Sequence, residues 1–125
     1  MIRHKRRSTP KLGGYRRLSV RQLRGRRARL AKQLPDVELT LHGSLQTQSR
    51  RCGKQGCSCA GAEGQLHGPY VYLAVRGGEG SRLLYITAQL IEDVTRRVEV
   101  TRQLEAVLLE ISAINLELLA RGELS

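Results

Sequence analysis

A stretch of 33 residues without Gly or Pro, residues 88–120, limits the fold of this chain more than any other feature. Its apolar side chains recur at 3-4 spacing, which predicts one continuous α-helix. At about 1.5 Å per residue this helix would span roughly 48 Å, more than one small domain covers. The spacing is typical of a coiled-coil seam. The seam positions are Ile91, Val94, Val98, Thr101, Leu104, Leu108, Ile111, Asn115 and Leu118.

Two interpretations of this helix remain open. At a seam position, Asn115 can fix the register and the number of strands in a coiled coil. The helix would then form a homodimer or dock on a larger recombinase or transposase. Alternatively, the helix packs on its own domain and leaves Asn115 exposed.

The residues before the long helix predict a small antiparallel sheet. Segments 70–76 and 81–87 alternate with period two and flank the glycine-rich turn 77–80, as in a β-hairpin. One face of this hairpin can pack on a helix, and the other carries Tyr and Arg. Partial alternation over 37–50 predicts one more strand, with a bulge or turn at Gly43.

The N-terminal part of the chain is strongly basic. Residues 1–35 hold 13 of the 22 Lys and Arg residues and no acid, and the chain has a net charge of +11. Helix-breaking Pro and Gly residues predict a disordered arm over 1–17. A helix is expected over 19–34, capped by Ser19 and followed by Pro35.

These elements together predict an α+β fold in three segments. Residues 1–35 form the basic arm and short helix, 36–87 a small β-sheet domain with a cysteine-rich loop, and 88–125 the long helix. The hairpin spans 70–87 and the helix runs from about 88 to 120. No segment approaches the ~20 apolar residues of a membrane span, and no signal peptide fits the basic N-terminus. We therefore expect a cytoplasmic protein.

The loop between the predicted strands contains all three cysteines of the chain. The spacing is Cys52-x4-Cys57-x-Cys59, with His67 eight positions further on. Three thiolates and one imidazole complete the tetrahedral shell of a structural zinc site, and the surrounding glycines permit the chain reversals that such a site needs. Zn²⁺ is therefore the expected cofactor, with His42 as a competing fourth ligand.

The same loop has two other interpretations. It can be a metal-free folded loop with small thiols, or a redox or nucleophilic thiol site activated by its basic neighbours. A nucleophilic thiolate would use His67 as its base, and Glu63 is the only acid in the loop. No paired carboxylates and no phosphate-binding Gly-rich loop leading into a helix are present, so we expect no enzymatic activity.

Three runs of sequence resemble a known family. These are GSL at 43–45, RRCGKQGCSCA at 50–60 and HGPYVYL at 67–73, followed by a hairpin and a long helix. The family comprises small uncharacterised bacterial and archaeal proteins (a domain of unknown function), and the resemblance covers roughly residues 37–118. Gln55 stands where the family usually has Pro. Glu79 stands where Lys is common, which weakens a phosphate-gripping role for the turn.

The resemblance supports the fold and gives no activity. It singles out Cys52, Cys57, Cys59, His67, Gly68, Pro69 and Tyr70. It also places such proteins beside transposases and recombinases. The hairpin and helix are similar to the three-stranded DNA-binding domains of some integrases, whose sheet enters the major groove, which is an analogy of fold.

The function expected from charge and motif is a non-enzymatic nucleic-acid-binding accessory protein of a mobile element or recombination system. Its partner would be duplex DNA, and the protein would be nucleoid-associated. Clustered Arg residues are suited to bidentate phosphate contacts. The candidate contact residues are Arg3, Lys5, Arg6, Arg7, Arg16, Arg17, Arg21, Arg24, Arg26, Arg27, Arg29, Arg50, Arg51, Lys54, Arg76 and Arg82.

Two alternatives compete with this function. One is a protein-interaction adaptor that acts through the long C-terminal helix, with a basic arm that only solubilises the chain or binds RNA. The other is a thiol-based redox or metal sensor.

Overall fold

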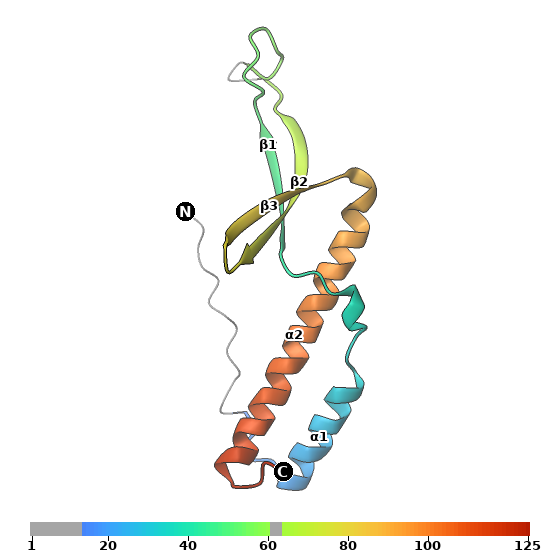
Figure 1. Cartoon of the computed structure of the whole chain (residues 1–125), viewed down its shortest axis with the longest axis vertical. Coiled ribbons are helices and arrows are strands. Elements are labelled where there is room, and N and C mark those ends of the chain that lie inside the picture. The colour runs from blue at the N-terminus through green and yellow to red at the C-terminus, as the bar shows by residue number, and fades with distance from the viewer. Residues whose placement is uncertain (1–13, 61–63) are drawn as a thin grey trace. The chain divides into compact units, whose positions relative to one another are not determined.

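A computed structural model describes residues 14–60 and 64–125 of the chain. The described residues form two helices and one antiparallel sheet, which confirms the α+β class (Figure 1). Short 3-10 turns precede β1 and α2, at Val37–Leu39 and Ala88–Leu90. The main elements are α1 (Val20–Lys32), β1 (Ser44–Arg50), β2 (His67–Gly77), β3 (Gly80–Ile86) and α2 (Ile91–Ala120).

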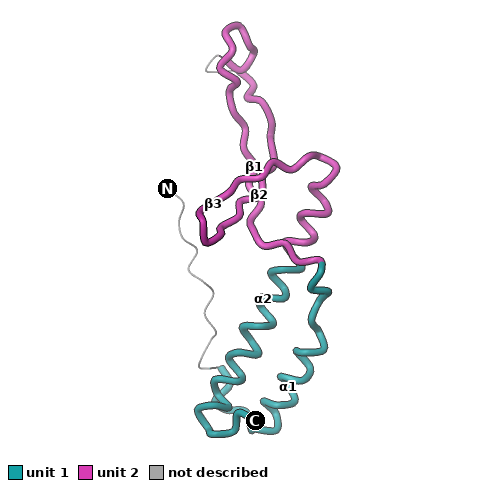
Figure 2. Tube along the Cα trace, viewed as in Figure 1, with its two compact units in different colours: residues 1–38, 100–125 teal, residues 39–99 magenta. Residues whose placement is uncertain are grey.

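The chain divides into two compact units, which Figure 2 shows in different colours. One unit contains the described residues up to Glu38 together with Val100–Ser125, and so combines α1 with most of α2. The other unit, Leu39–Glu99, contains the sheet and the first turns of α2. The long helix predicted from the sequence is confirmed, and it contributes to both units. Among the described helices, none is both long and apolar enough to cross a membrane.

The sheet unit is a three-stranded meander in the order β1-β2-β3. The predicted hairpin is confirmed: β2 and β3 pair from Val71 opposite Ile86 to Gly77 opposite Gly80. Two residues, Gly78 and Glu79, connect the strands, which is the commonest hairpin connection.

The core of the sheet unit lies between one sheet face and α2. Leu73 and Ile86 from the sheet pack with Val94 and Val98, which lie one helical turn apart on α2. Partly buried residues complete this core, namely Leu41, Leu45, Val71, Val75 and Ile91. Two of the predicted seam residues, Val94 and Val98, are therefore buried within the chain.

The strand predicted over 37–50 forms only in its second half, from Ser44 to Arg50. Its first residues instead form the 3-10 turn, which begins beside Asp36, whose side chain accepts a hydrogen bond from the Glu38 amide at 3.1 Å. Gly43 separates the two parts, with φ of 155° and Leu73 Cδ1 only 2.8 Å from where a Cβ would lie. The strand prediction from the alternation over 37–41 is therefore wrong, because local turn chemistry and Gly43 override that pattern.

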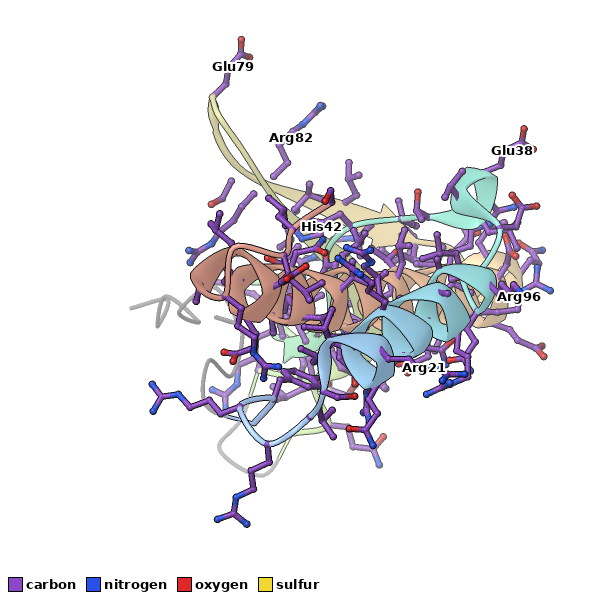
Figure 3. The ribbon with its side chains drawn as sticks, turned by 90° about the horizontal axis from the view of Figure 1, so that it is seen from below. Arg21, Glu38, His42, Glu79, Arg82 and Arg96 are labelled. Atoms are coloured by element: carbon purple, nitrogen blue, oxygen red, sulfur yellow. The ribbon has the colours of Figure 1, made fainter. Side chains whose placement is uncertain are left out.

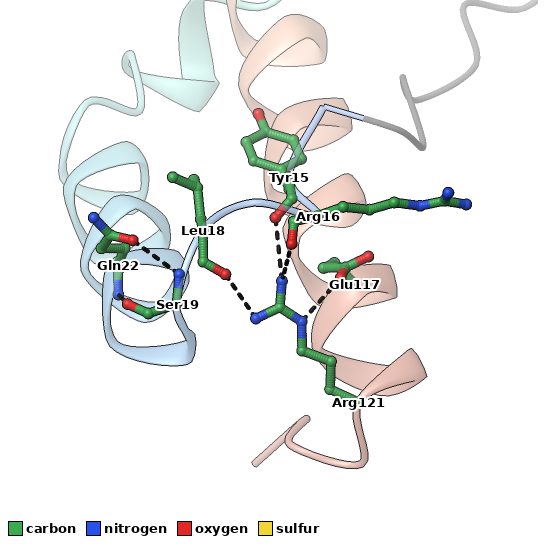
Figure 4. Close-up of polar contacts among 7 residues, drawn as sticks. All are labelled: Tyr15, Arg16, Leu18, Ser19, Gln22, Glu117 and Arg121. Carbon is green, nitrogen blue, oxygen red and sulfur yellow. Dashed lines mark hydrogen bonds and ion pairs between the residues drawn. The ribbon is translucent and has the colours of Figure 1, made fainter.

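The helical unit packs α1 alongside the C-terminal part of α2 (Figure 1). Its core consists of Leu23 from α1 and of Ile114 and Leu118 from α2, all fully buried. Ser19 caps α1 as predicted. It accepts a hydrogen bond from the Gln22 amide, and the Gln22 side chain accepts one from the Ser19 amide (Figure 4).

Residues 14–17 correct part of the expected disordered arm. They form a turn that is held by Arg121, the residue directly after α2: its guanidinium donates to the backbone carbonyls of Tyr15 and Arg16, and to that of the adjacent Leu18 (Figure 4). The Tyr15 hydroxyl donates to Glu110 at 2.9 Å. Residues 1–13 of the expected arm lie outside the described residues.

Asn115 accepts a hydrogen bond from Arg27 Nη1 at 2.8 Å. Its amide therefore has a partner on α1 of the same chain, which supplies an intramolecular reason for a polar residue at this seam position. Other seam positions keep much of their surface, and Leu108 is 52% exposed. Packing within the chain accordingly covers part of the predicted seam.

The sheet core provides a matched test of stability. Leu73→Ala should lower the free energy of unfolding by about 2–5 kcal/mol, because Leu73 is fully buried. Leu84→Ala removes the same atoms from the directly opposite residue, which is 44% exposed, and should cost less than about 1 kcal/mol. Urea unfolding followed by tyrosine fluorescence measures both, since three of the four tyrosines lie in this unit. Equal losses would contradict the core assignment.

Candidate metal centre

The cysteine-rich loop connects β1 to β2 and is shaped by two successive turns. The Cys57 amide donates to the carbonyl of Lys54 at 3.4 Å, and the Ala60 amide donates to the carbonyl of Cys57 at 2.9 Å. Gly56 is the third residue of the first turn and has φ of 79°, a value that favours Gly at that position. These turns reverse the chain twice within a short segment.

The turns bring the four predicted ligands together. The Sγ atoms of Cys52, Cys57 and Cys59 and one ring nitrogen of His67 all lie within 4.8 Å of one another. Cys52 Sγ is 3.5 Å from Cys59 Sγ, and Cys57 Sγ is 3.2 Å from His67 Nε2. The expectation that these four side chains can share a metal ion is therefore supported by geometry. His42, the competing ligand, lies outside the cluster.

Each ligand is positioned by a different part of the loop. Cys52 follows β1, Cys57 and Cys59 lie in the two turns, and His67 is the first residue of β2, opposite Arg50 in the sheet register. Cys59 is 1% exposed, whereas Cys52 is exposed to solvent. The cluster therefore has one buried side and one open side, through which an ion can enter.

Backbone amides point at the sulfur atoms. The Cys52 amide donates to Cys59 Sγ at 3.4 Å. The pKa of the Cys57 thiol is lowered to about 6, first by the backbone amide of Cys59 and then by the His67 ring. A thiol with this pKa is a thiolate at neutral pH, and the thiolate is the form that binds metals. The loop thus favours the thiolate form of at least one of the four clustered side chains.

The cluster does not form a disulfide. All three cysteines are free thiols, and the Cys52–Cys59 sulfur separation of 3.5 Å exceeds the ~2.05 Å of an S–S bond. A redox pair would use two of the four groups and leave His67 and one thiol unexplained. A metal ion uses all four. Glu63, the one carboxylate of the loop, lies outside the described residues.

Gly64 approaches the cysteine turn very closely. A Cβ at this position would lie 2.2 Å from the carbonyl oxygen of Ser58 and 2.9 Å from the carbonyl carbon of Cys59. Only Gly permits such an approach. The segment that leads into His67 is therefore packed against the turn that carries Cys59, and His67 and Cys59 are two of the four clustered side chains.

The basic residues predicted to contact nucleic acid fall into three groups. Those at positions 3, 5, 6 and 7 lie outside the described residues. Arg24, Arg26 and Arg27 bind within the helical unit, to Glu123, Glu110 and Asn115 respectively. The remaining members are exposed to solvent, namely Arg16, Arg17, Arg21, Arg29, Arg50, Arg51, Lys54, Arg76 and Arg82. Figure 3 shows Arg21 on α1 and Arg82 near the end of the β2–β3 hairpin.

An aromatic cluster on the sheet was not among the predicted site residues. The rings of Tyr70 and Tyr72 make edge-to-face contacts with Tyr85, with centroid separations of 6.2 and 5.7 Å. The Arg50 guanidinium lies 5.6 Å from the Tyr70 centroid and 5.7 Å from that of Tyr72. Alternation in the hairpin places the tyrosines on one face. The position of Arg50 could not be predicted, because the register of β1 shifts between Gln48 and Arg50.

Comparison with known proteins identifies a family. Residues 20–96 match the family model described as domain of unknown function (DUF6788), and the chain belongs to this family. This match confirms the expected relation to an uncharacterised family. The matched region begins at the first residue of α1 and ends early in α2. No curated protein and no solved structure matches the chain.

Gly64 gives a test of the loop geometry. Gly64→Ala should displace the cysteine turn, because its Cβ would overlap the Ser58 carbonyl. It should weaken Co²⁺ binding by about 10–100-fold, as is common for groups that orient metal ligands. Gly78→Ala is the control, since a Cβ there meets nothing within 4 Å. Titration of Co²⁺–thiolate absorption measures both, and wild-type affinity in Gly64→Ala would contradict the close approach.

Proposed function

We propose that this member of the family is a non-enzymatic nucleic-acid-binding accessory protein that acts on DNA. The observation that carries the proposal is that only some of the arginines in the helical unit bind partners within the chain. Arg24, Arg26 and Arg27 bind partners within the chain. Arg16, Arg17, Arg21 and Arg29 remain exposed. The fold therefore uses only part of this basic charge.

The charge balance supports a polyanionic partner. The chain carries a net charge of +11, and residues 1–35 contain no acid. Arg presents a planar fork that matches phosphate oxygens, and it stays ionised under all physiological conditions. Phosphate contacts of this kind supply affinity and register without sequence specificity. We accordingly assign the exposed arginines to the phosphate backbone.

The metal in the loop is proposed to be zinc. Three thiolates and one imidazole form a typical donor set for structural Zn²⁺, whereas Ca²⁺ and Mg²⁺ prefer oxygen ligands. Cys52, Cys57, Cys59 and His67 would fill all four tetrahedral positions and leave none open for a substrate. Zinc would then brace the connection between β1 and β2. It would also stiffen the basic residues that lie beside the cluster in sequence, at positions 50, 51 and 54.

An accessory role beside a recombinase or transposase follows from the family resemblance and is part of the proposal. The same holds for a location in the cytoplasm, at the nucleoid.

Salt dependence tests the phosphate contacts. Arg21→Gln with Arg29→Gln should weaken binding to a 20-bp duplex and reduce the slope of log K against log salt by up to about 0.9 for each phosphate that is no longer neutralised. Arg96→Gln with Arg102→Gln removes the same charge from α2 and should leave the slope nearly unchanged. Fluorescence anisotropy across a salt series measures both pairs, and zinc, expected at one per chain, is assayed on every preparation.

Two outcomes would contradict the proposal. Absence of binding near physiological salt would exclude a nucleic-acid function. An equal reduction of the slope in both variants would show that binding depends on net charge alone and not on the arginines of α1. Deletion of residues 1–35 is a poorer test, because it also removes Leu23 from the core of the helical unit.

A second candidate function is association through α2. Leu108 and Leu119 are 52% and 57% exposed and lie about three helical turns apart, which places them on one side of the helix. Two large apolar side chains on one side favour a helical partner. The occupant that we propose is the α2 helix of a second copy, which would make the protein a homodimer.

Light scattering at micromolar concentration tests the dimer. The wild-type chain should have twice its mass of 14.0 kDa. Leu108→Gln with Leu119→Gln should be monomeric, because each substitution places an amide in the apolar contact. Leu34→Gln with Leu83→Gln alters two leucines that are 41% and 47% exposed and lie outside α2, so this variant should stay dimeric. A monomeric wild-type protein would contradict the proposal.

A further inference from the structure

The sheet has one buried face and one open face. Strand pairing places Val71, Leu73 and Ile86 on the face that packs on α2. Successive residues in a strand point to opposite sides. Tyr70, Tyr72 and Tyr85 therefore share the other face, which we call the aromatic face. This face carries three of the four tyrosines in the chain, which has no Phe or Trp.

The aromatic face is ordered by contacts among its own side chains. Edge-to-face packing against Tyr70 and Tyr72 fixes the plane of the Tyr85 ring. Arg50 lies over both neighbours and donates a hydrogen bond to the Tyr72 hydroxyl. Tyr72 is only 8% exposed, whereas Tyr85 is 57% exposed. The cluster thus holds one ring rigidly while leaving it accessible to solvent.

The charge around the aromatic face favours an anionic partner. The three described strands contain neither Asp nor Glu, and they contain Arg50, Arg76 and Arg82. Arg50 and Arg76 lie on the aromatic face. Arg82 pairs with Val75 and lies on the opposite face. Two glutamines of β1, at positions 46 and 48, share the aromatic face and supply neutral donors and acceptors. An acidic backbone with flat apolar groups fits these properties.

We propose that the aromatic face binds single-stranded DNA by stacking an unpaired base on Tyr85, with Arg50 directed toward the adjacent phosphates. The proposal rests on the nucleic-acid function proposed above and specifies its substrate. Stacking on exposed aromatic rings, combined with a positive surface, is how many proteins bind single strands. Bases inside a duplex already stack on their neighbours and offer only their edges. The aromatic face therefore discriminates unpaired from paired DNA.

The stacking contact and the phosphate contacts have different signatures. Removing an arginine that neutralises a phosphate changes the salt slope. Removing the stacking ring lowers affinity and leaves the slope nearly unchanged, because no counterion is released at an aromatic ring. Tyr85 and the arginines of α1 can therefore be tested in the same titration.

The experiment compares Tyr85→Leu with Tyr85→Phe in the full chain. The probes are a labelled oligothymidylate and an oligouridylate, each of about 12 nucleotides to match the site size of small single-strand binders, and a duplex of the same length. Tyr85→Leu should weaken oligothymidylate binding by about 5- to 150-fold and duplex binding by less than about twofold. Tyr85→Phe keeps the ring and should bind within about threefold of the wild type. Leu84→Ala, on the other face, is the control for stability.

A direct readout accompanies the affinities. An oligonucleotide with 5-iododeoxyuridine should crosslink to Tyr85 under ultraviolet light, as identified by mass spectrometry of the peptide. Tyr85→Leu should abolish that crosslink.

Each alternative result has a defined meaning. If Tyr85→Leu binds oligothymidylate like the wild type while salt-dependent duplex binding persists, the aromatic face is not a base-binding site and the proposed function stands. If no probe binds, both proposals fail. Tighter binding of oligouridylate than of oligothymidylate would overturn the assignment to DNA.

Discussion

The apolar side of α2 changes its partner along the helix, and both hydrophobic cores that the described residues form depend on it. Val94 and Val98 pack on the sheet, while Ile114 and Leu118 pack on α1. A three-stranded sheet buries only one of its faces against a helix, and α1 has one fully buried residue. Neither partner could form a stable core alone. One long helix without Gly or Pro provides the apolar surface for both.

Much of this arrangement follows from sequence pattern, and the exceptions have physical causes. The hairpin and α2 were predictable because their periodicities are long and uninterrupted. The clustering of the four candidate ligands was predictable because they lie close together in a segment rich in Gly. The start of β1 was not, because Gly43 and Asp36 override the alternation before it. The partners of Arg24, Arg26 and Arg27 depend on tertiary contacts with residues more than eighty positions away.

The candidate metal centre and the aromatic face are parts of one structure. Arg50 is paired with His67 across the sheet, so a residue that contacts the tyrosines lies opposite a candidate metal ligand. The shift of register after Gln48 creates this pairing. A metal ion that ordered the loop would therefore also restrict the position of Arg50, because Arg50 and His67 lie at the paired ends of β1 and β2. Rigid strands position functional side chains more accurately than the loop alone could.

The ion pairs that α1 makes with the C-terminal part of the chain limit which segments could be exchanged between members of this family. The family match ends at residue 96, yet α1 lies inside it and is held by residues beyond it. Arg24 binds Glu123, Arg26 binds Glu110, and Leu23 packs on Leu118. A chimera that exchanged the matched region between two family members would separate these pairs. Residues 20–32 and 110–123 therefore form one structural block, although the whole sheet unit lies between them in sequence.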